Sequence, residues 1–309
     1  MTDSNPSSEQ RPDSSSTDDT GFIIKKQRRW PIFAGVGIVV VLIAAFFITR
    51  DGDDKSEALA DTSKPVVVST FGANVAEVEL IDYIDQEIAP KYGIDLEFRD
   101  ISDSTQLNRA VSEGEVGGTI YQHKFWLDQV LEANPDFNEE VAAEVFRWGF
   151  GIWSTKHDDV SEIPDGGTVT LPADPANEAY ALFALDAAGL ITLKEGTKPE
   201  LATQDDIDEN PKNLEFKLIE YTAQARTLDD VDAAVGYTEV FIIAEIDPSH
   251  EIFAAPTPDA FIGQLTIGSD FADTESIKKL VEAFKDPAIQ EYLKTGQDDL
   301  PYGLLPLES

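Results

Sequence analysis

Strand-like and helix-like hydrophobic patterns alternate along most of this chain. The apolar run of residues 65–70 predicts a buried strand, and a turn then leads to apolar residues at helical spacing over 75–89. Residues 93–98 alternate as a second strand, 104–112 predict a short helix, and 119–121 predict a third strand. Strands and helices that alternate in this way predict βαβ units and a parallel sheet.

The alternation continues through the second half of the chain. Residues 144–154 predict an extended, aromatic segment in which Gly149 and Gly151 allow a bend. The later predicted elements are strands over 168–171, 214–221 and 261–268, a buried turn or strand over 235–237, and helices over 177–188, 227–231, 274–285 and 287–294. We therefore expect an α/β protein of two lobes, with chain crossings near 147–152 and 250–258. A ligand would lie at the carboxyl ends of the strands, in the crevice between the lobes.

The first 64 residues have a different pattern. Residues 1–29 are polar and end in a basic cluster, which predicts a disordered cytoplasmic tail. Residues 30–49 form an uncharged apolar run long enough to span a bilayer, and residues 50–64 form a polar linker. The positive charge before the run predicts a single-pass membrane protein with an extracytoplasmic C-terminal domain. A buried core helix and a signal peptide cleaved after Ala60 are the alternatives.

Composition narrows the classes of function. The chain of 309 residues has a formal net charge of −36 and no cysteine. Nucleic-acid binding is not expected, because it needs clustered Lys and Arg. The lack of cysteine excludes thiol catalysis, thiolate metal sites and a lipidated cysteine, so an anchor would have to be peptide.

The sequence offers little for catalysis, and we predict a protein that is not an enzyme and needs no cofactor or metal. No HExxH, GxSxG or Walker A motif occurs. His157 and His250 lie in polar segments typical of surface loops, which leaves His123 as the only plausible general base. Paired acidic residues are typical of helix starts and solvated loops.

The segment YQHKFWLDQ, residues 121–129, combines aromatic side chains with His123 and Gln122 at the end of a predicted strand. Aromatic rings supply apolar contact area, and His and Gln supply directional hydrogen bonds. This position and composition indicate ligand contact. Packing of Phe125 and Trp126 against their own helix is the alternative.

This segment resembles the F-Q-H-x-x-[YF]-L-[DE] motif of the NlpA/MetQ family of methionine-binding proteins. Further motifs follow in the same order: LPADPAN at 171–177, AGLITLKEG at 188–196, ENPKNL at 209–214 and RTLDD at 226–230. The resemblance covers about residues 65–300. It implies a type II periplasmic-binding-protein fold that passes methionine, or a related amino acid, to the permease and ATPase subunits of an ABC importer. We expect one lobe over 65–148 plus 252–309 and the other over 149–251.

The resemblance also implies a set of pocket residues and three departures from the family pattern. The ligand-binding residues we predict are Ser104, Tyr121, His123, Trp126, Asn177, Tyr180 and Tyr237. Tyr180 stands where the family has an Arg that pairs with the ligand carboxylate, and Tyr237 stands where it has an Asn. Ser104 replaces an aromatic residue.

These departures leave the chemical identity of the solute undecided. Within the same fold, the ligand is either an amino acid such as methionine or a solute that lacks a carboxylate or carries positive charge. Glu178 and Glu239, both near altered positions, could balance such a charge. A sensor or adaptor ectodomain that does not transport is a further alternative.

Overall fold

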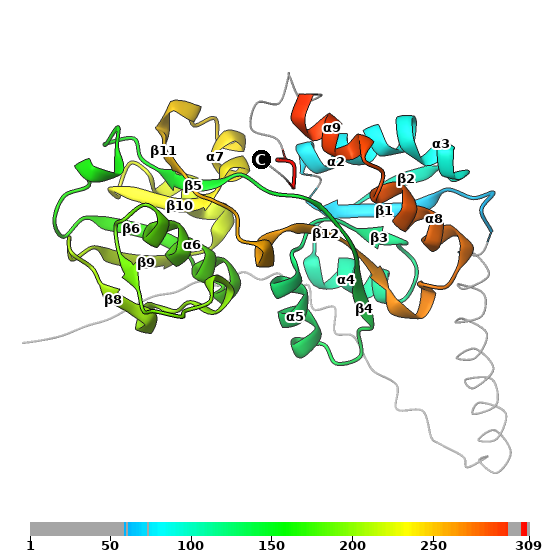
Figure 1. The fold of residues 1–309 in the computed structure, drawn as a ribbon, viewed down its shortest axis with the longest axis horizontal. Helices are drawn as coiled ribbons and strands as arrows, with labels where there is room; N and C mark the ends of the chain where they lie inside the picture. Colours follow the sequence, from blue (N-terminus) through cyan, green and yellow to red (C-terminus); the bar gives the residue numbers. More distant parts are fainter. Residues whose placement is uncertain (1–58, 60, 73, 296–303, 308–309) are drawn as a thin grey trace, which may run out of the picture. The chain divides into compact units, whose positions relative to one another are not determined.

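The computed structural model describes residue 59 and residues 61–72, 74–295 and 304–307, which belong to one compact unit over residues 48–309 (Figure 1). The predicted tail, the apolar run and most of the linker lie outside the described residues. Among the helices of the described ranges, none is both long enough and apolar enough to cross a membrane.

A mixed sheet organises the first part of the described chain. Its strands are β1 (Val66–Phe71), β2 (Leu96–Ile101), β3 (Gly118–Thr119), β4 (Glu139–Phe146) and β12 (Gly263–Gly268), in the order β2-β1-β3-β12-β4. Strand β1 is parallel to β2 and β3, with Val66 opposite Leu96. Strand β12 is antiparallel to β3 and β4. The expected parallel sheet is therefore wrong at β12, where a late segment of the chain returns in the opposite direction between β3 and β4.

Helices cover both faces of this sheet. They are α2 (Val75–Tyr83), α3 (Ala89–Tyr92), α4 (Ser104–Ser112), α5 (Lys124–Ala133), α8 (Glu275–Phe284) and α9 (Ala288–Thr295). Alternate side chains of β1 point to opposite faces. Val66 and Val68 pack with residues of α2 and α8, and Val67 packs with the residues of α4. The single helix predicted over 75–89 is divided, because a π-helical turn (Ile84–Ile88) separates α2 from α3.

A second mixed sheet is built from the middle of the chain. Its strands are β5 (Phe150–Trp153), β6 (Thr168–Pro172), β9 (Glu215–Ile219), β10 (Ala233–Tyr237) and β11 (Glu251–Ala254), in the order β11-β5-β10-β6-β9. Helices α6 (Pro175–Ala187) and α7 (Thr238–Ile243) pack with it. Strands β7 (Thr192–Leu193) and β8 (Ile207–Glu209) pair in a separate two-stranded antiparallel sheet. Short 3₁₀ turns lie at Val160–Glu162, Pro199–Leu201, Gln204–Asp206, Tyr221–Thr227, Pro248–His250, Asp259–Phe261 and Ser269–Phe271.

The helix predicted to open at Thr227 is wrong. A 3₁₀ helix ends there instead, spanning Tyr221–Thr227. The Thr227 hydroxyl donates to the Gln224 carbonyl at 2.7 Å, so it is bonded to the turn before it. A threonine that caps a following helix would use its oxygen on amides further along the chain.

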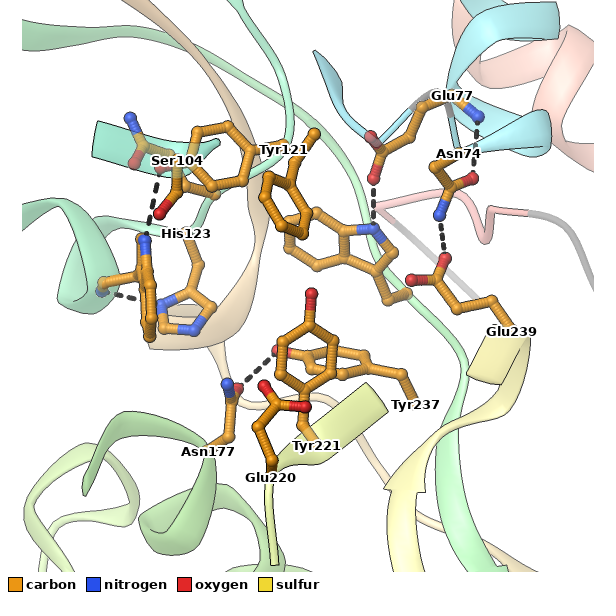
Figure 2. A pocket seen from close by; sticks show the side chains of 14 residues that line it. Asn74, Glu77, Ser104, Tyr121, His123, Asn177, Glu220, Tyr221, Tyr237 and Glu239 are labelled. Carbon is orange, nitrogen blue, oxygen red and sulfur yellow. Dashed lines mark hydrogen bonds between the residues drawn. The ribbon is translucent and has the colours of Figure 1, made fainter. Parts of the chain in front are cut away.

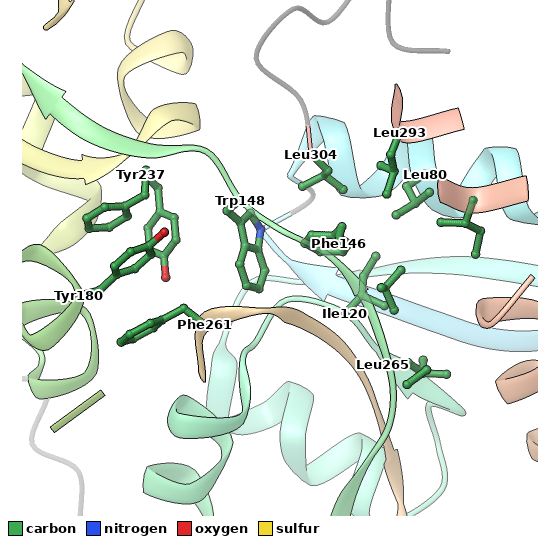
Figure 3. Packing of buried hydrophobic residues seen from close by; sticks show 14 of the residues in the cluster. Leu80, Ile120, Phe146, Trp148, Tyr180, Tyr237, Phe261, Leu265, Leu293 and Leu304 are labelled. Carbon is green, nitrogen blue, oxygen red and sulfur yellow. The ribbon is translucent and has the colours of Figure 1, made fainter. Parts of the chain in front are cut away.

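The extended segment predicted over 144–154 belongs to two sheets, because β4 ends at Phe146 and β5 begins at Phe150. Gly149, between these strands, allows the chain to pass close to the start of α7, since a Cβ there would lie 2.8 Å from the Thr238 hydroxyl oxygen. Buried aromatic side chains fill this region, among them Trp148, which packs edge-on against Phe146 at 4.9 Å (Figure 3).

Candidate functional site

A pocket of about 200 Å³ lies at the carboxyl ends of strands from both sheets. Its lining residues are Phe71, Asn74, Glu77, Ser104, Tyr121, Gln122, His123, Trp126, Trp148, Asn177, Glu220, Tyr221, Tyr237 and Glu239. Figure 2 shows His123 and Ser104 on one side of the pocket, and Glu77, Asn74 and Glu239 on the other. Strand ends of α/β sheets are the usual place for a small ligand, and this volume suits a solute of metabolite size.

His123 is positioned by the start of α5. Its Nδ1 accepts the Trp126 backbone N–H at 3.1 Å, so the side chain caps the helix. The proton of the neutral ring then lies on Nε2. His123 is 3% exposed, and burial lowers its pKa to about 4, against an opposing hydrogen bond with Asn177. The side chain is therefore a neutral hydrogen-bond donor at neutral pH.

Tyr121, Trp126 and Ser104, three of the residues predicted from the sequence, line the same pocket. The Tyr121 hydroxyl accepts hydrogen bonds from Trp126 Nε1 at 3.3 Å and from the Asn108 side chain. Burial raises the pKa of Tyr121, so its phenol stays protonated. These contacts fix an aromatic wall with a hydroxyl at its edge.

Asn177 and Tyr237 reach the pocket from the second sheet and its helix α6. Asp174 caps α6 by accepting the Asn177 N–H at 2.9 Å, and it also accepts the Asn177 side-chain N–H at 3.0 Å. The Tyr237 hydroxyl donates to Asn177 Oδ1 at 2.7 Å. The two side chains thus bind each other as well as lining the pocket.

Tyr180 is the one predicted site residue that does not line the pocket. It is fully buried, and its ring stacks between Phe150 at 3.9 Å and Phe261 at 4.4 Å (Figure 3). Tyr180 stands where the family has an Arg that pairs with the ligand carboxylate. Because its ring is packed between other aromatic rings, outside the pocket, Tyr180 cannot take over that role.

Glu77, Asn74 and Trp148 are pocket residues that the sequence prediction missed. Glu77 Oε1 accepts from Trp148 Nε1 at 2.8 Å, and its other oxygen accepts from the Thr70 hydroxyl. Asn74 caps α2 and donates its side-chain N–H to Glu239. Burial raises the pKa of Glu77, and the nearby Glu239 raises it further. Burial also raises the pKa of Glu239.

Phe71, Glu220 and Tyr221 were also missed, although all lie at or just after strand ends. Gln122, which the sequence analysis names beside His123, lines the pocket as well. The rule that ligands bind at the carboxyl ends of strands could have found them. Glu178, considered as a charge partner for a cationic solute, does not line the pocket and accepts a hydrogen bond from Gln204 at 2.6 Å.

The pocket chemistry suits binding by hydrogen bonds, aromatic contact and charge. A general base works best with a pKa near the operating pH, and the pKa of His123 lies far below it. In the described ranges, no three His, Asp or Glu side chains cluster in a way that could hold a metal ion.

Comparisons with known proteins agree with this architecture. The family model described as NlpA lipoprotein matches residues 68–300. A probable D-methionine-binding lipoprotein MetQ from Pasteurella multocida is 30% identical over 269 residues, covering 86% of this chain and 97% of the relative.

Two solved structures have the same fold. A nutrient-binding protein from Burkholderia cenocepacia bound to methionine has 28% identity and a TM-score of 0.64, covering 75% of this chain and 96% of that one. A periplasmic substrate-binding protein of an ABC transporter from Coxiella burnetii has 28% identity and a TM-score of 0.67, covering 78% of this chain and 99% of that one. The expected α/β periplasmic-binding fold with two sheets is confirmed. Its predicted membrane helix lies outside the described residues.

Proposed function

The chain belongs to the NlpA lipoprotein family, and from this premise we propose that it is an extracytoplasmic substrate-binding protein. In this role it binds methionine or a related small solute and passes it to the permease and ATPase of an ABC importer. It is a binding protein and not an enzyme, in keeping with its relatives described as methionine-binding lipoproteins and as a substrate-binding protein of an ABC transporter.

The family match over residues 68–300 is the observation that carries this proposal. The segment that bears the family motif, with Tyr121, His123 and Trp126, lines the pocket together with Asn177. A pocket of about 200 Å³ with aromatic walls is suited to a solute of amino-acid size.

We further propose that the two sheets act as two lobes in a type II arrangement, one formed by residues 65–148 plus 252–309 and the other by 149–251. Sheet membership supports most of this division, because β5, β6, β9 and β10 pair, within the described residues, with one another and not with strands of the first sheet. Strand β11 also belongs to the second sheet, although the proposed boundary assigns its residues 252–254 to the first lobe. Pocket residues come from both parts, as with Glu77 in α2 and Glu239 in α7. A solute bound to both would favour their closure.

Residues 30–49 are proposed as the membrane anchor, with residues 50–64 as its linker. The support is the sequence itself, because 20 uncharged residues follow a basic cluster. The chain has no cysteine to carry the lipid that the family name implies. In this proposal a peptide anchor holds the binding domain at the outer face of the cell membrane.

Uptake in cells tests the transport role. Deletion of the gene is expected to reduce high-affinity uptake of labelled methionine or of its decarboxylated analogue, methylthiopropylamine. Expression of the full chain should restore that uptake. If deletion alters the uptake of neither compound, the proposed function is wrong.

A further inference from the structure

The charged side chains of the pocket all have the same sign. Glu77, Glu220 and Glu239 line it, and no Lys or Arg does so among the residues that the structure describes. His123 adds no charge at neutral pH, because its pKa is lowered to about 4. The pocket is therefore acidic and has no cation of its own to balance its carboxyl groups.

Glu77 and Glu239 lie on the same side of the pocket and are held by neutral donors (Figure 2). The indole of Trp148 and the hydroxyl of Thr70 donate to Glu77, and the Asn74 side chain donates to Glu239. Glu77 is 3% exposed. Burying carboxyl groups without a counter-charge is unfavourable and raises the pKa values of Glu77 and Glu239, so a cation placed beside them would favour their ionised forms and pair with them.

A solute carboxylate finds no cationic partner among the described residues that line the pocket. Tyr180 is buried outside the pocket, and the Tyr237 hydroxyl is bonded to Asn177, whose side-chain N–H is bonded to Asp174. The guanidinium of Arg147 is directed elsewhere, since it donates to the Leu307 carbonyl at 2.9 Å and to the Thr257 carbonyl. The N-terminal end of α5 is capped by His123.

The remaining lining favours a donor-rich cation. Six aromatic side chains line the pocket, and aromatic faces attract ammonium groups. The buried side chain of Gln122, which also lines the pocket, is 1% exposed. Its Oε1 has no hydrogen-bond partner within the described ranges. This acceptor is an observation independent of the acidic pair, and it calls for a donor on the solute.

We propose that the solute is a primary-amine cation of about the size of methionine that lacks a free carboxylate, with Glu77 and Glu239 as its counter-charge. This inference rests on the proposed function and specifies the class of solute that the site carries. The ammonium group lies against the acidic side of the pocket, and the apolar part of the solute contacts the aromatic walls.

Three matched probes test the charge requirement on the full chain in detergent, freed of bound solute by unfolding and refolding. They are L-methionine, decarboxylated methionine (methylthiopropylamine) and deaminated methionine (methylthiobutanoate). By calorimetry at neutral pH, the amine is expected to bind at least about tenfold more tightly than methionine, because the carboxylate of methionine would be left without a partner in the pocket. The deaminated acid is expected not to bind.

Two variants locate the effect. Glu239→Gln keeps the shape but removes the charge, and it should weaken binding of the amine by about tenfold or more while the affinity for methionine changes less. Glu77→Gln provides a second test at the partner carboxyl. Glu178→Gln is the matched control outside the pocket and should leave both affinities unchanged.

Methionine binding as tightly as the amine, or more tightly, would overturn the inference and leave the proposed function intact. Failure of the amine to bind would also overturn it, as would an unchanged amine affinity in both pocket variants. The proposed function fails on a different result, namely uptake in cells that does not depend on the gene.

Discussion

Glu139 shows how one buried side chain makes stability depend on pH. It is 6% exposed, and neither carboxyl oxygen has a hydrogen-bond partner within the described part of the chain. Burial raises its pKa from 4.5 to about 8. The folded protein therefore holds this proton more tightly than the unfolded chain does.

Stability from the protonated carboxyl is fully present below pH 4.5 and is lost as the pH rises through about 8. Glu139→Gln keeps the neutral form at every pH. Relative to this variant, the wild-type free energy of unfolding should fall by at most about 1.4 kcal/mol per pH unit in this window. The difference should level off above it. Chemical denaturation at a series of pH values measures the change.

Glu140 supplies the control because it is the next residue of β4 and is exposed. Glu140→Gln should follow the wild-type pH dependence closely. If Glu139→Gln shows the same pH dependence as the wild type, the Glu139 carboxyl is ionised in the folded protein and the prediction is wrong.

At the scale of elements, Arg147 ties the C-terminal segment to the chain crossing after β4. The backbone groups of Arg147 and Leu305 exchange hydrogen bonds of 2.8 and 2.7 Å. The guanidinium adds bonds to the carbonyls of Leu307 and Thr257. One side chain therefore joins three segments that are far apart in the sequence.

Arg147→Met removes the guanidinium and these side-chain hydrogen bonds. It keeps an unbranched apolar side chain in place of the apolar stem of arginine. We expect a loss of about 1–3 kcal/mol in the free energy of unfolding, because the carbonyl acceptors lose their donor. Proteolytic trimming at the C-terminus should also become faster. Thermal denaturation and limited proteolysis with mass analysis measure both effects.

Arg99→Met is the comparison variant, because the Arg99 side chain is 45% exposed and forms a surface ion pair, with 3.8 Å between its guanidinium nitrogen and a carboxylate oxygen of Glu97. Exposed pairs of this kind contribute about 0–1 kcal/mol. Equal destabilisation by the two variants would mean that Arg147 contributes no more than a surface arginine.

At the scale of the whole molecule, the proposed peptide anchor gives a direct prediction. The full chain should remain in the membrane fraction after an alkaline wash, because a run of 20 uncharged, mostly apolar residues is long enough to span a bilayer. A variant that lacks residues 30–49 should be released. Cell fractionation followed by mass measurement distinguishes these outcomes.

Deletion of residues 1–20 is the control, because it leaves the apolar run and the basic cluster in place. That variant should stay in the membrane. Recovery of the wild type as a soluble species that begins after Ala60 would instead identify a cleaved signal peptide.

Much of the fold could be predicted from the sequence, because hydrophobic periodicity depends on neighbours in the chain. The patterns around β1, β2, β6 and α6 each indicated the element that forms there. The direction of a strand within its sheet was harder to predict from the sequence. Nothing local in residues 261–268 distinguishes a parallel strand from the antiparallel β12, since direction depends on where the chain returns.

The sequence alone determined the family motifs, the loss of the expected Arg at position 180 and the absence of cysteine. Only the tertiary structure decided what surrounds the altered positions. It placed Tyr180 in a stack of rings, and it brought Glu77 and Glu239 to one pocket across more than half of the described chain. The physical reason is that burial and charge pairing depend on distances in space, which residues far apart in sequence acquire only when the chain folds.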